Sequence, residues 1–382
     1  MPEVYLDNSA TTTVDPQVAQ KIYDVMTVGY GNPSSLHKRG FQAQLELDKS
    51  REIIADILDC RADEIVFTGS GSEANNLAIH GVAKANARRK GSLVVSAAEH
   101  SSVLNAFKEL EKQGWKLDII NPLSDGTPDI DALVGAVGED TLLVSAMLVN
   151  SETGAICDVK SLASRVKRKN PSTYLHCDAV QGFCRQVVFP GLWGIDLLSV
   201  SGHKINGPKG VGALYIRKGV RLLPLYYGGG QEKGLRPGTE NVASISGFAL
   251  AAEQMFSQRK AILDRFEQLR RKLLEDCKKV QGICINSPQN GAPYIMNISL
   301  PGLRSETIIH FLEARDIYIS SGSACSKGAK SPVLTSMGLD DARIDSALRI
   351  SFGKYNTADD IDALIAGLIE ARNTLASREE KR

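Results

Sequence analysis

The sequence lacks a long hydrophobic run, an excess of charge of either sign, and paired cysteines. A membrane-spanning helix needs about 18 or more consecutive apolar residues, and no segment here approaches that length. The 45 lysines and arginines against 44 aspartates and glutamates leave a net charge of +1, which does not favour binding to nucleic acid or an anionic membrane. The seven cysteines form no CxxC pair, so we expect neither a disulfide scaffold nor a metal site. The first six residues lack the basic flank of a signal peptide, and we expect a cytoplasmic protein.

Strand-like apolar runs alternate with helical patterns between about residues 63 and 227. The strand candidates lie at 65–68, 93–96, 141–147, 173–177, 197–200 and 212–216. Such alternation predicts an α/β fold with a mainly parallel sheet flanked by helices. After the glycine-rich stretch at 228–238, an amphipathic helix at 257–280 and several short strands and helices predict a smaller α+β part. Because 382 residues are enough for two domains, we expect a large domain at 15–255 and a small one at 1–14 and 256–382.

Lys204 directly follows a predicted buried strand, in Ser201-Gly202-His203-Lys204. A lysine in a desolvated pocket loses its proton more easily than one in water, and the neutral amine can condense with an aldehyde such as pyridoxal phosphate. Ser201 and His203 are candidate donors to a phosphate beside the lysine. The alternative is a surface lysine in a glycine-rich loop.

A second predicted strand, at 65–68, ends in Gly69-Ser70-Gly71-Ser72 and opens into a helix. Backbone N–H groups and the helix dipole at such a turn favour a phosphate, and Ser72 adds a hydroxyl. The same glycines loosely fit a dinucleotide fingerprint. The acidic residue that a dehydrogenase needs about twenty residues later is missing, which argues against that alternative.

Two more strand ends carry residues suited to a flat, charged ring. His100 follows the strand at 93–96, where an imidazole can stack on a ring and move protons, or simply cap a helix. Asp178 follows the strand at 173–177, with Gln181 about one helical turn later. A partly buried carboxylate needs a cation such as a protonated pyridine nitrogen, although it can also be a helix cap. Since ligands of open α/β sheets bind at the carboxyl ends of strands, these features together predict a pyridoxal phosphate site.

Several motifs resemble the cysteine desulfurases of the class V aminotransferase family, the fold-type I pyridoxal phosphate enzymes. They are Tyr5-Leu6-Asp7-Asn8-Ser9-Ala10-Thr11-Thr12, Gly31-Asn32-Pro33-Ser34-Ser35, Glu99-His100, Ser201-Gly202-His203-Lys204, Arg236-Pro237-Gly238-Thr239 and Ser321-Gly322-Ser323-Ala324-Cys325. The resemblance covers the chain from Tyr5 to about Gly367. It implies a homodimer in which Thr239 reaches the cofactor phosphate of the neighbouring subunit.

The resemblance also implies a role for each site residue. Lys204 would be the Schiff-base lysine, Asp178 the partner of the pyridine nitrogen, His100 the stacking imidazole and Gln181 a donor to the ring hydroxyl. Gly71, Ser72, Ser201 and His203 would hold the phosphate. The family usually has two adjacent asparagines where this chain has Asn150-Ser151. Asn150 is carried over as a cofactor and substrate contact, and Ser151, which is shorter, as a cofactor contact that can act through water.

Two residues are candidates for the chemistry of the substrate. Cys325 lies in a loop with Lys327 and Lys330 nearby, which favour the attacking thiolate, whereas the other cysteines have apolar or helical surroundings. Arg349 alternates with Leu348 and Ile350 on a predicted strand, and its guanidinium suits a substrate carboxylate. The alternatives without a catalytic role are that Cys325 is an incidental loop cysteine and that Arg349 is a solvated arginine at a strand edge.

The sequence thus predicts a cysteine desulfurase that converts L-cysteine to L-alanine and leaves a persulfide on Cys325. The sulfur would pass to an acceptor protein, either an iron–sulfur scaffold or a tRNA thiolation enzyme. The alternatives are a selenocysteine lyase, a related class V aminotransferase, and a non-catalytic sulfur-delivery protein.

Overall fold

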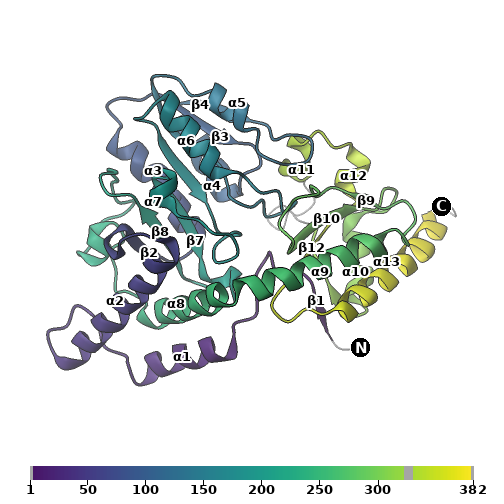
Figure 1. Ribbon diagram of the computed structural model, residues 1–382, viewed down its shortest axis with the longest axis horizontal. Coiled ribbons are helices and arrows are strands. Elements are labelled where there is room, and N and C mark those ends of the chain that lie inside the picture. Colours follow the sequence, from purple (N-terminus) through teal and green to yellow (C-terminus); the bar gives the residue numbers. More distant parts are fainter. Residues whose placement is uncertain (1–2, 322–329, 380–382) are drawn as a thin grey trace.

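A central sheet dominates the computed structural model, which describes residues 3–321 and 330–379 (Figure 1). Within these residues seven strands pair in the order β2-β8-β7-β6-β5-β3-β4. Their bounds are β2 Ile65–Thr68, β3 Ser92–Ser96, β4 Lys116–Ile120, β5 Thr141–Ser145, β6 Tyr174–Asp178, β7 Leu197–Ser201 and β8 Gly212–Ile216. Strand β8 is antiparallel to both β2 and β7, and the other pairs are parallel. Every strand except β8 therefore runs the same way, and their carboxyl ends lie along one edge.

Helices cover both faces of this sheet. They are α1 Pro16–Thr27, α2 Lys38–Leu58, α3 Gly71–Ala85, α4 Ser101–Lys112, α5 Ile130–Gly135, α6 Val159–Lys169, α7 Pro190–Trp193 and α8 Val242–Ser257, with 3-10 turns η1 Ala62–Glu64, η2 Gly202–Lys204 and η3 Gln231–Gly234. Leu93 and Val95 of β3 belong to the cluster that packs on α3 and α4, whereas Val94 belongs to the cluster that includes α2, α6 and α8. A strand buried on both sides must be apolar at every position, which explains the continuous apolar runs of the sequence.

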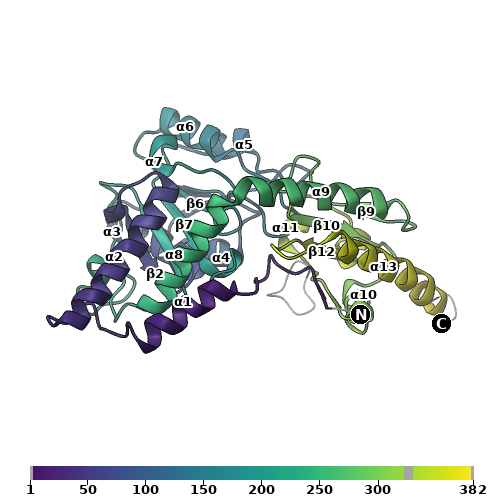
Figure 2. The same cartoon turned by 60° about the horizontal axis from the view of Figure 1, so that its bottom comes forward.

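The remaining elements form two small sheets and their helices. They are β1 Val4–Tyr5, α9 Arg259–Cys277, β9 Cys284–Ile285, β10 Ile295–Ser299, α10 Ser305–Glu313, β11 Ile317–Tyr318, α11 Pro332–Ser336, α12 Asp341–Asp345, β12 Ala347–Ser351 and α13 Ala358–Glu379. Strands β12-β10-β9 are antiparallel, and β1 pairs in parallel with β11. Figures 1 and 2 show this group at the opposite end of the molecule from α1 and α2. We propose that the domain boundaries predicted from the sequence separate these two groups of elements.

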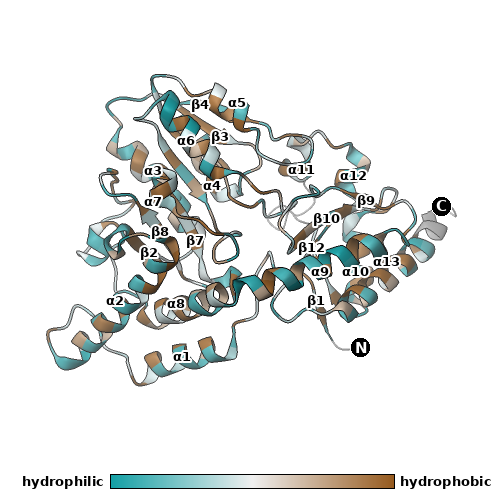
Figure 3. Ribbon diagram, viewed as in Figure 1, coloured by the Kyte–Doolittle hydropathy of each residue, from teal (hydrophilic) through white to brown (hydrophobic). Residues whose placement is uncertain are grey.

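The predicted fold class is confirmed, and one strand of the central sheet was missed. The edge strand β4 contains Lys116 and Asp118, so it shows no apolar run. The helix expected at 257–280 is α9, whose hydrophilic and hydrophobic residues alternate in bands along its length (Figure 3). Among the described residues, none of the helices combines the length and apolar character needed to cross a membrane.

Candidate active site

The carboxyl edge of the central sheet collects most of the predicted site residues. Each comes from the segment that follows a different strand: Gly71 and Ser72 after β2, His100 after β3, Asn150 and Ser151 after β5, Asp178 and Gln181 at the end of β6, and Ser201, His203 and Lys204 at the end of β7. The rule that ligands bind at this edge thus places the candidate site here.

The Lys204 amine lies in a largely buried position within the turn η2. Its Nζ donates hydrogen bonds to the carbonyl oxygens of Ser9 and Ala10, the second at 2.8 Å. Burial, helped by the positive charge of Arg349, lowers the pKa of Lys204 to about 8. A larger share of this amine is therefore neutral at physiological pH than for a lysine in water, as a nucleophilic amine requires.

The N-terminal segment 7–12 lies between this lysine and strand β12. Asn8 Nδ2 donates to the carbonyl oxygen of Ser351 at 2.9 Å, and the Ser351 hydroxyl accepts from the Ser9 N–H at 2.8 Å. On the other side, the Thr12 hydroxyl donates to the His203 carbonyl oxygen at 2.9 Å. The carbonyl groups that hold Lys204 are thus fixed by residues from both ends of the chain.

Asp178 and His100 are joined by two residues that the sequence analysis missed. Asn75 Nδ2 donates to Asp178 Oδ2 at 2.8 Å and to the Ser102 hydroxyl at 2.9 Å, and that hydroxyl lies 2.8 Å from His100 Nδ1. Asn75 is one helical turn after Gly71 in α3 and is buried. The only signal for it was this position on the helix that starts at the phosphate turn.

The same contacts assign the tautomer of His100. Its Nδ1 accepts from the Ser102 backbone N–H at 3.1 Å, so the ring proton of the neutral imidazole is on Nε2. Burial lowers the pKa of His100, and the nearby Asp178 carboxylate only partly opposes this. The imidazole is therefore a neutral group whose Nε2–H is available to a ligand.

Asp178 and Gln181 have the polar groups that pyridoxal phosphate needs. Asp178 is 3% exposed, and in the described part of the chain no lysine, arginine or histidine forms an ion pair with it. Gln181 donates to the Ser9 carbonyl oxygen at 2.9 Å, while its buried Oε1 has no hydrogen-bond partner among the described residues. A protonated pyridine nitrogen would compensate the charge of Asp178, so these residues fit the group.

The turn before α3 suits a phosphate. Gly71 is the first residue of the helix, and a Cβ there would come within 2.6 Å of Val180 Cγ2. Only glycine therefore allows the helix N-terminus to lie so close to β6 and β7. The Ser70 side chain caps the Glu73 N–H at 3.1 Å, and Ser72 is exposed. Ser201 is buried behind the turn, and burial together with the charge of Lys204 lowers the pKa of His203 to about 4.

Asn150 is buried and makes hydrogen bonds within its own loop. Its Oδ1 accepts from the N–H groups of Glu152 and Thr153 at 2.9 and 2.8 Å, and its Nδ2 donates to the Ala98 carbonyl oxygen at 2.8 Å. The side chain thus joins the 150–154 turn to the turn that carries His100. Its predicted direct contacts with cofactor and substrate stay predictions, as does that of Ser151.

Arg349 on β12 faces the same region from the C-terminal half. It is 3% exposed, so it is not a solvated strand-edge arginine. Its Nη1 donates to the Ser151 carbonyl oxygen at 3.1 Å, and Nη2 forms an ion pair with Asp7 at 2.7 Å. Asp7 lies in the motif at 5–12, but the sequence did not predict a role for it. A lone acidic residue near the N-terminus gives no indication of its partner.

The last two predicted residues differ in what can be said of them. Thr239 is exposed on the segment after η3, and its contact with a neighbouring subunit stays a prediction. Cys325 lies outside the described residues. On either side of it, the Ser320 backbone pairs with that of Arg349, and the Ser331 hydroxyl donates to Glu152 Oε2 at 2.5 Å.

Comparisons with known proteins agree with this geometry. Residues 4–364 match the family model described as aminotransferase class-V. The chain is 36% identical over 378 residues to a protein of Archaeoglobus fulgidus named cysteine desulfurase IscS 1, covering 97% of this chain and 98% of the relative. A solved structure named "NIFS-like protein" superposes with a TM-score of 0.92 at 36% identity, covering 97% of this chain and 99% of that chain. A structure titled "SspA in complex with cysteine" has a TM-score of 0.82 at 33% identity, covering 92% and 99%.

These matches extend over nearly the whole of both chains, and the predicted family and cofactor are confirmed. The chain belongs to the class V aminotransferase family of pyridoxal phosphate-dependent enzymes.

Proposed function

We propose that this protein is a cysteine desulfurase that takes sulfur from L-cysteine and releases L-alanine. The observation that carries the proposal is the buried Lys204 amine, with its pKa lowered to about 8, at the sheet edge that also holds Asp178 and His100. When bound, pyridoxal phosphate supplies an aldehyde and an electron-withdrawing ring that stabilises negative charge on the substrate α-carbon. The relatives named cysteine desulfurase support the same activity.

Each described residue has a role in this proposal. Asp178 would hold the ring nitrogen of the cofactor in its protonated form, and the Gly71 turn with Ser72, Ser201 and His203 would hold its phosphate. Arg349 binds the carboxylate of L-cysteine with a guanidinium that is already fixed by Asp7. The neutral Lys204 amine takes a proton from the α-carbon, and His100 Nε2–H donates a proton toward the product.

The sulfur step is assigned to Cys325. Its thiolate attacks the substrate sulfur, an S–S bond forms, and the Cβ–S bond breaks with its electron pair left on Cβ. Cβ takes up a proton, and the α-carbon regains the proton that Lys204 removed. The products are L-alanine and a Cys325 persulfide. We expect the sulfur to pass in the cytoplasm to an iron–sulfur scaffold or a tRNA thiolation enzyme.

We also propose that the enzyme is a homodimer. A group of large apolar side chains on α1, α2 and the loop between them is more than half exposed: Tyr23, Met26, Val28, Tyr30, Leu36, Phe41 and Leu45. Such a patch favours burial against a second copy. Thr239 is exposed in the single chain, where a partner can reach it.

The test is alanine production from L-cysteine by the wild type and by Cys325→Ser. The variant is expected to lose alanine release while keeping the visible absorbance of the bound cofactor. Cys284→Ser, at a cysteine that is only partly buried, is the control and should keep both. Alanine release by Cys325→Ser at the wild-type rate would reject the role of this thiol, and a colourless wild-type protein would reject the enzyme. Parallel assays with selenocysteine and with a keto acid would identify a selenocysteine lyase or an aminotransferase.

A further inference from the structure

Residues 226–240 form a segment, here called the strap. Two ion pairs connect it to helices α2 and α3, which precede and follow strand β2 in the chain. Glu232 pairs with Arg51 of α2 at 2.7 Å, and Arg236 pairs with Glu73 of α3 at 3.0 Å. The proposed function gives no role to either pair. The strap also contains Thr239, which makes its position relevant to the cofactor.

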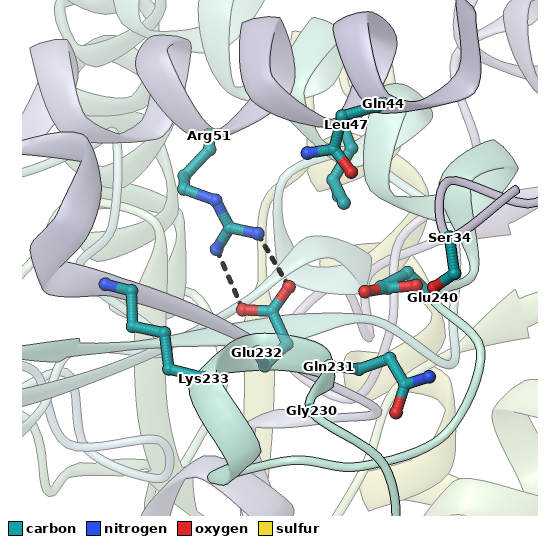
Figure 4. A pocket seen from close by; sticks show the side chains of 9 residues that line it. All are labelled: Ser34, Gln44, Leu47, Arg51, Gly230, Gln231, Glu232, Lys233 and Glu240. Carbon is teal, nitrogen blue, oxygen red and sulfur yellow. Dashed lines mark hydrogen bonds and ion pairs between the residues drawn. The ribbon is translucent and has the colours of Figure 1, made fainter. Parts of the chain in front are cut away.

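Glu232 is the more buried of the two anchors. Its side chain is 2% exposed, and its two oxygens accept from both terminal nitrogens of Arg51 at 2.7 and 2.8 Å (Figure 4). One oxygen also accepts from the Phe67 N–H at 2.9 Å, and Arg51 donates to the Ile65 carbonyl oxygen at 2.8 Å. Strand β2 is at the edge of the sheet, so this ion pair satisfies its outer backbone groups. Two residues after Phe67 the chain enters the phosphate turn.

The second anchor acts on that turn directly. Glu73 Oε1 accepts from Arg236 Nε, while its Oε2 accepts from the Gly69 N–H at 2.8 Å. Tyr226, at the other end of the strap, donates to the same Oε1 at 3.1 Å. One carboxylate therefore binds both the strap and the first residue of the phosphate turn.

The strap is held to α2 by an ion pair and hydrogen bonds, not by close packing of side chains. A cavity of about 340 Å³ lies between α2 and the strap, and only the Arg51–Glu232 pair is drawn across it in Figure 4. Glu232 and Lys233 have φ values of 45° and 60°. Side-chain-bearing residues stay in this left-handed region only where their surroundings fix them. The hydrogen bonds of Glu232 supply that constraint.

We propose that Arg51 and Glu232 are positioning residues for the cofactor phosphate of both subunits. They fix the turn at 69–72 within their own chain, and they hold the strap so that Thr239, seven residues after Glu232, meets the phosphate of the neighbouring subunit. This inference rests on the proposed pyridoxal phosphate-dependent homodimer.

The test is the rate at which the purified holoenzyme loses cofactor. Glu232→Gln keeps the shape of the side chain and removes its charge. We expect this variant to raise the rate constant for cofactor loss at least tenfold, as measured by the decrease in visible absorbance during dialysis. Arg51→Lys, which cannot form the two-pronged pair, should act in the same direction if Glu232→Gln fails to fold. The dimer mass from light scattering should be unchanged.

Asp196→Asn is the matched control. Asp196 Oδ2 accepts from Lys167 Nζ at 2.6 Å and from the Leu175 N–H at 2.8 Å, and its side chain is 5% exposed. It is likewise a buried carboxylate that binds a cation and a strand N–H, but it directly precedes the interior strand β7, at the amino ends of the parallel strands. Equal cofactor retention in Glu232→Gln and Asp196→Asn would overturn the proposal.

A heterodimer tests the action on the neighbouring subunit. One chain carries Glu232→Gln and Lys204→Ala, and the other is unchanged, so the one intact lysine faces the altered strap of its partner. The expected result is faster cofactor loss than from the heterodimer with Lys204→Ala alone, and equal rates contradict the inference. A wild-type protein that is colourless or monomeric would instead contradict the proposed function.

Discussion

Replacing Lys204 with methionine in the cofactor-free protein should reveal the cost of burying this amine. Its pKa is about 8 in the folded chain against 10.5 for lysine in water, so carrying the charge costs the folded state about 3 kcal/mol at pH 7. Methionine has a similar length and no charge, and Lys204→Met removes this cost.

The sign of the pH dependence follows from linkage. Between about pH 8 and 10.5 the folded protein has released the proton while the unfolded chain still binds it, so the stability of the wild type rises with pH. The variant also loses the hydrogen bonds to the carbonyl oxygens of Ser9 and Ala10, each worth about 1–3 kcal/mol. That loss is nearly independent of pH and cancels in the comparison. The stability of Lys204→Met relative to the wild type should therefore fall by about 2–3 kcal/mol between pH 7 and pH 10.

The assay is urea unfolding of both cofactor-free proteins at these two pH values. Lys209→Met, at an exposed lysine five residues later, is the control for adding a methionine to this loop. If the difference in free energy of unfolding between Lys204→Met and the wild type is the same at pH 7 and pH 10, the amine is not desolvated and the argument for its reactivity fails.

Three further variants test other parts of the site. Arg349→Lys should raise the KM for L-cysteine at least tenfold, because an ammonium cannot bind a carboxylate in two places; an unchanged KM in steady-state kinetics would rule out this contact. Asn75→Ala should lower the free energy of unfolding of the cofactor-free protein by about 1–3 kcal/mol, since it leaves a buried oxygen of Asp178 without its donor, and urea titration measures this. Burial, together with the nearby Asp178 carboxylate, raises the pKa of Glu99 well above its usual range, so ionising this carboxyl destabilises the folded protein. Glu99→Gln should therefore remove a loss of stability that the wild type shows as the pH rises above 4.5. The same pH profile in both proteins, measured by urea titration, would show that the pKa of Glu99 is not raised.

The sequence predicted the fold well where burial determines the residue pattern. Strands β3 and β7 are buried at every position, so they appear as apolar runs between helices. Strand β4 lies at the edge of the sheet, and its polar and apolar residues are mixed. Its residue pattern therefore does not distinguish it from a loop. The order β2-β8-β7 could not be predicted, because antiparallel β8 forms its pairs through long-range contacts.

The site divides in a similar way. Lys204, His100 and Asp178 were predictable because each follows a buried strand, and the ends of parallel strands meet at one edge. Asn75 and Ser102 lie inside the first turns of helices, where such residues usually face solvent. The carbonyl groups of Ser9 and Ala10 belong to the backbone, so no residue type identifies them. Contacts of this kind depend on the path of an irregular segment, which local patterns do not specify.

The path of segment 7–12 has a consequence for biosynthesis. The carbonyl groups that bind Lys204 are held in turn by Ser351, more than 340 residues later in the chain. A nascent chain has already made its lysine but lacks strand β12 until synthesis is nearly finished. Until then segment 7–12 lacks its contacts with Ser351, and the amine lacks the nearby charge of Arg349. The surroundings that lower the pKa of Lys204 are therefore complete only when both ends of the polypeptide have come together.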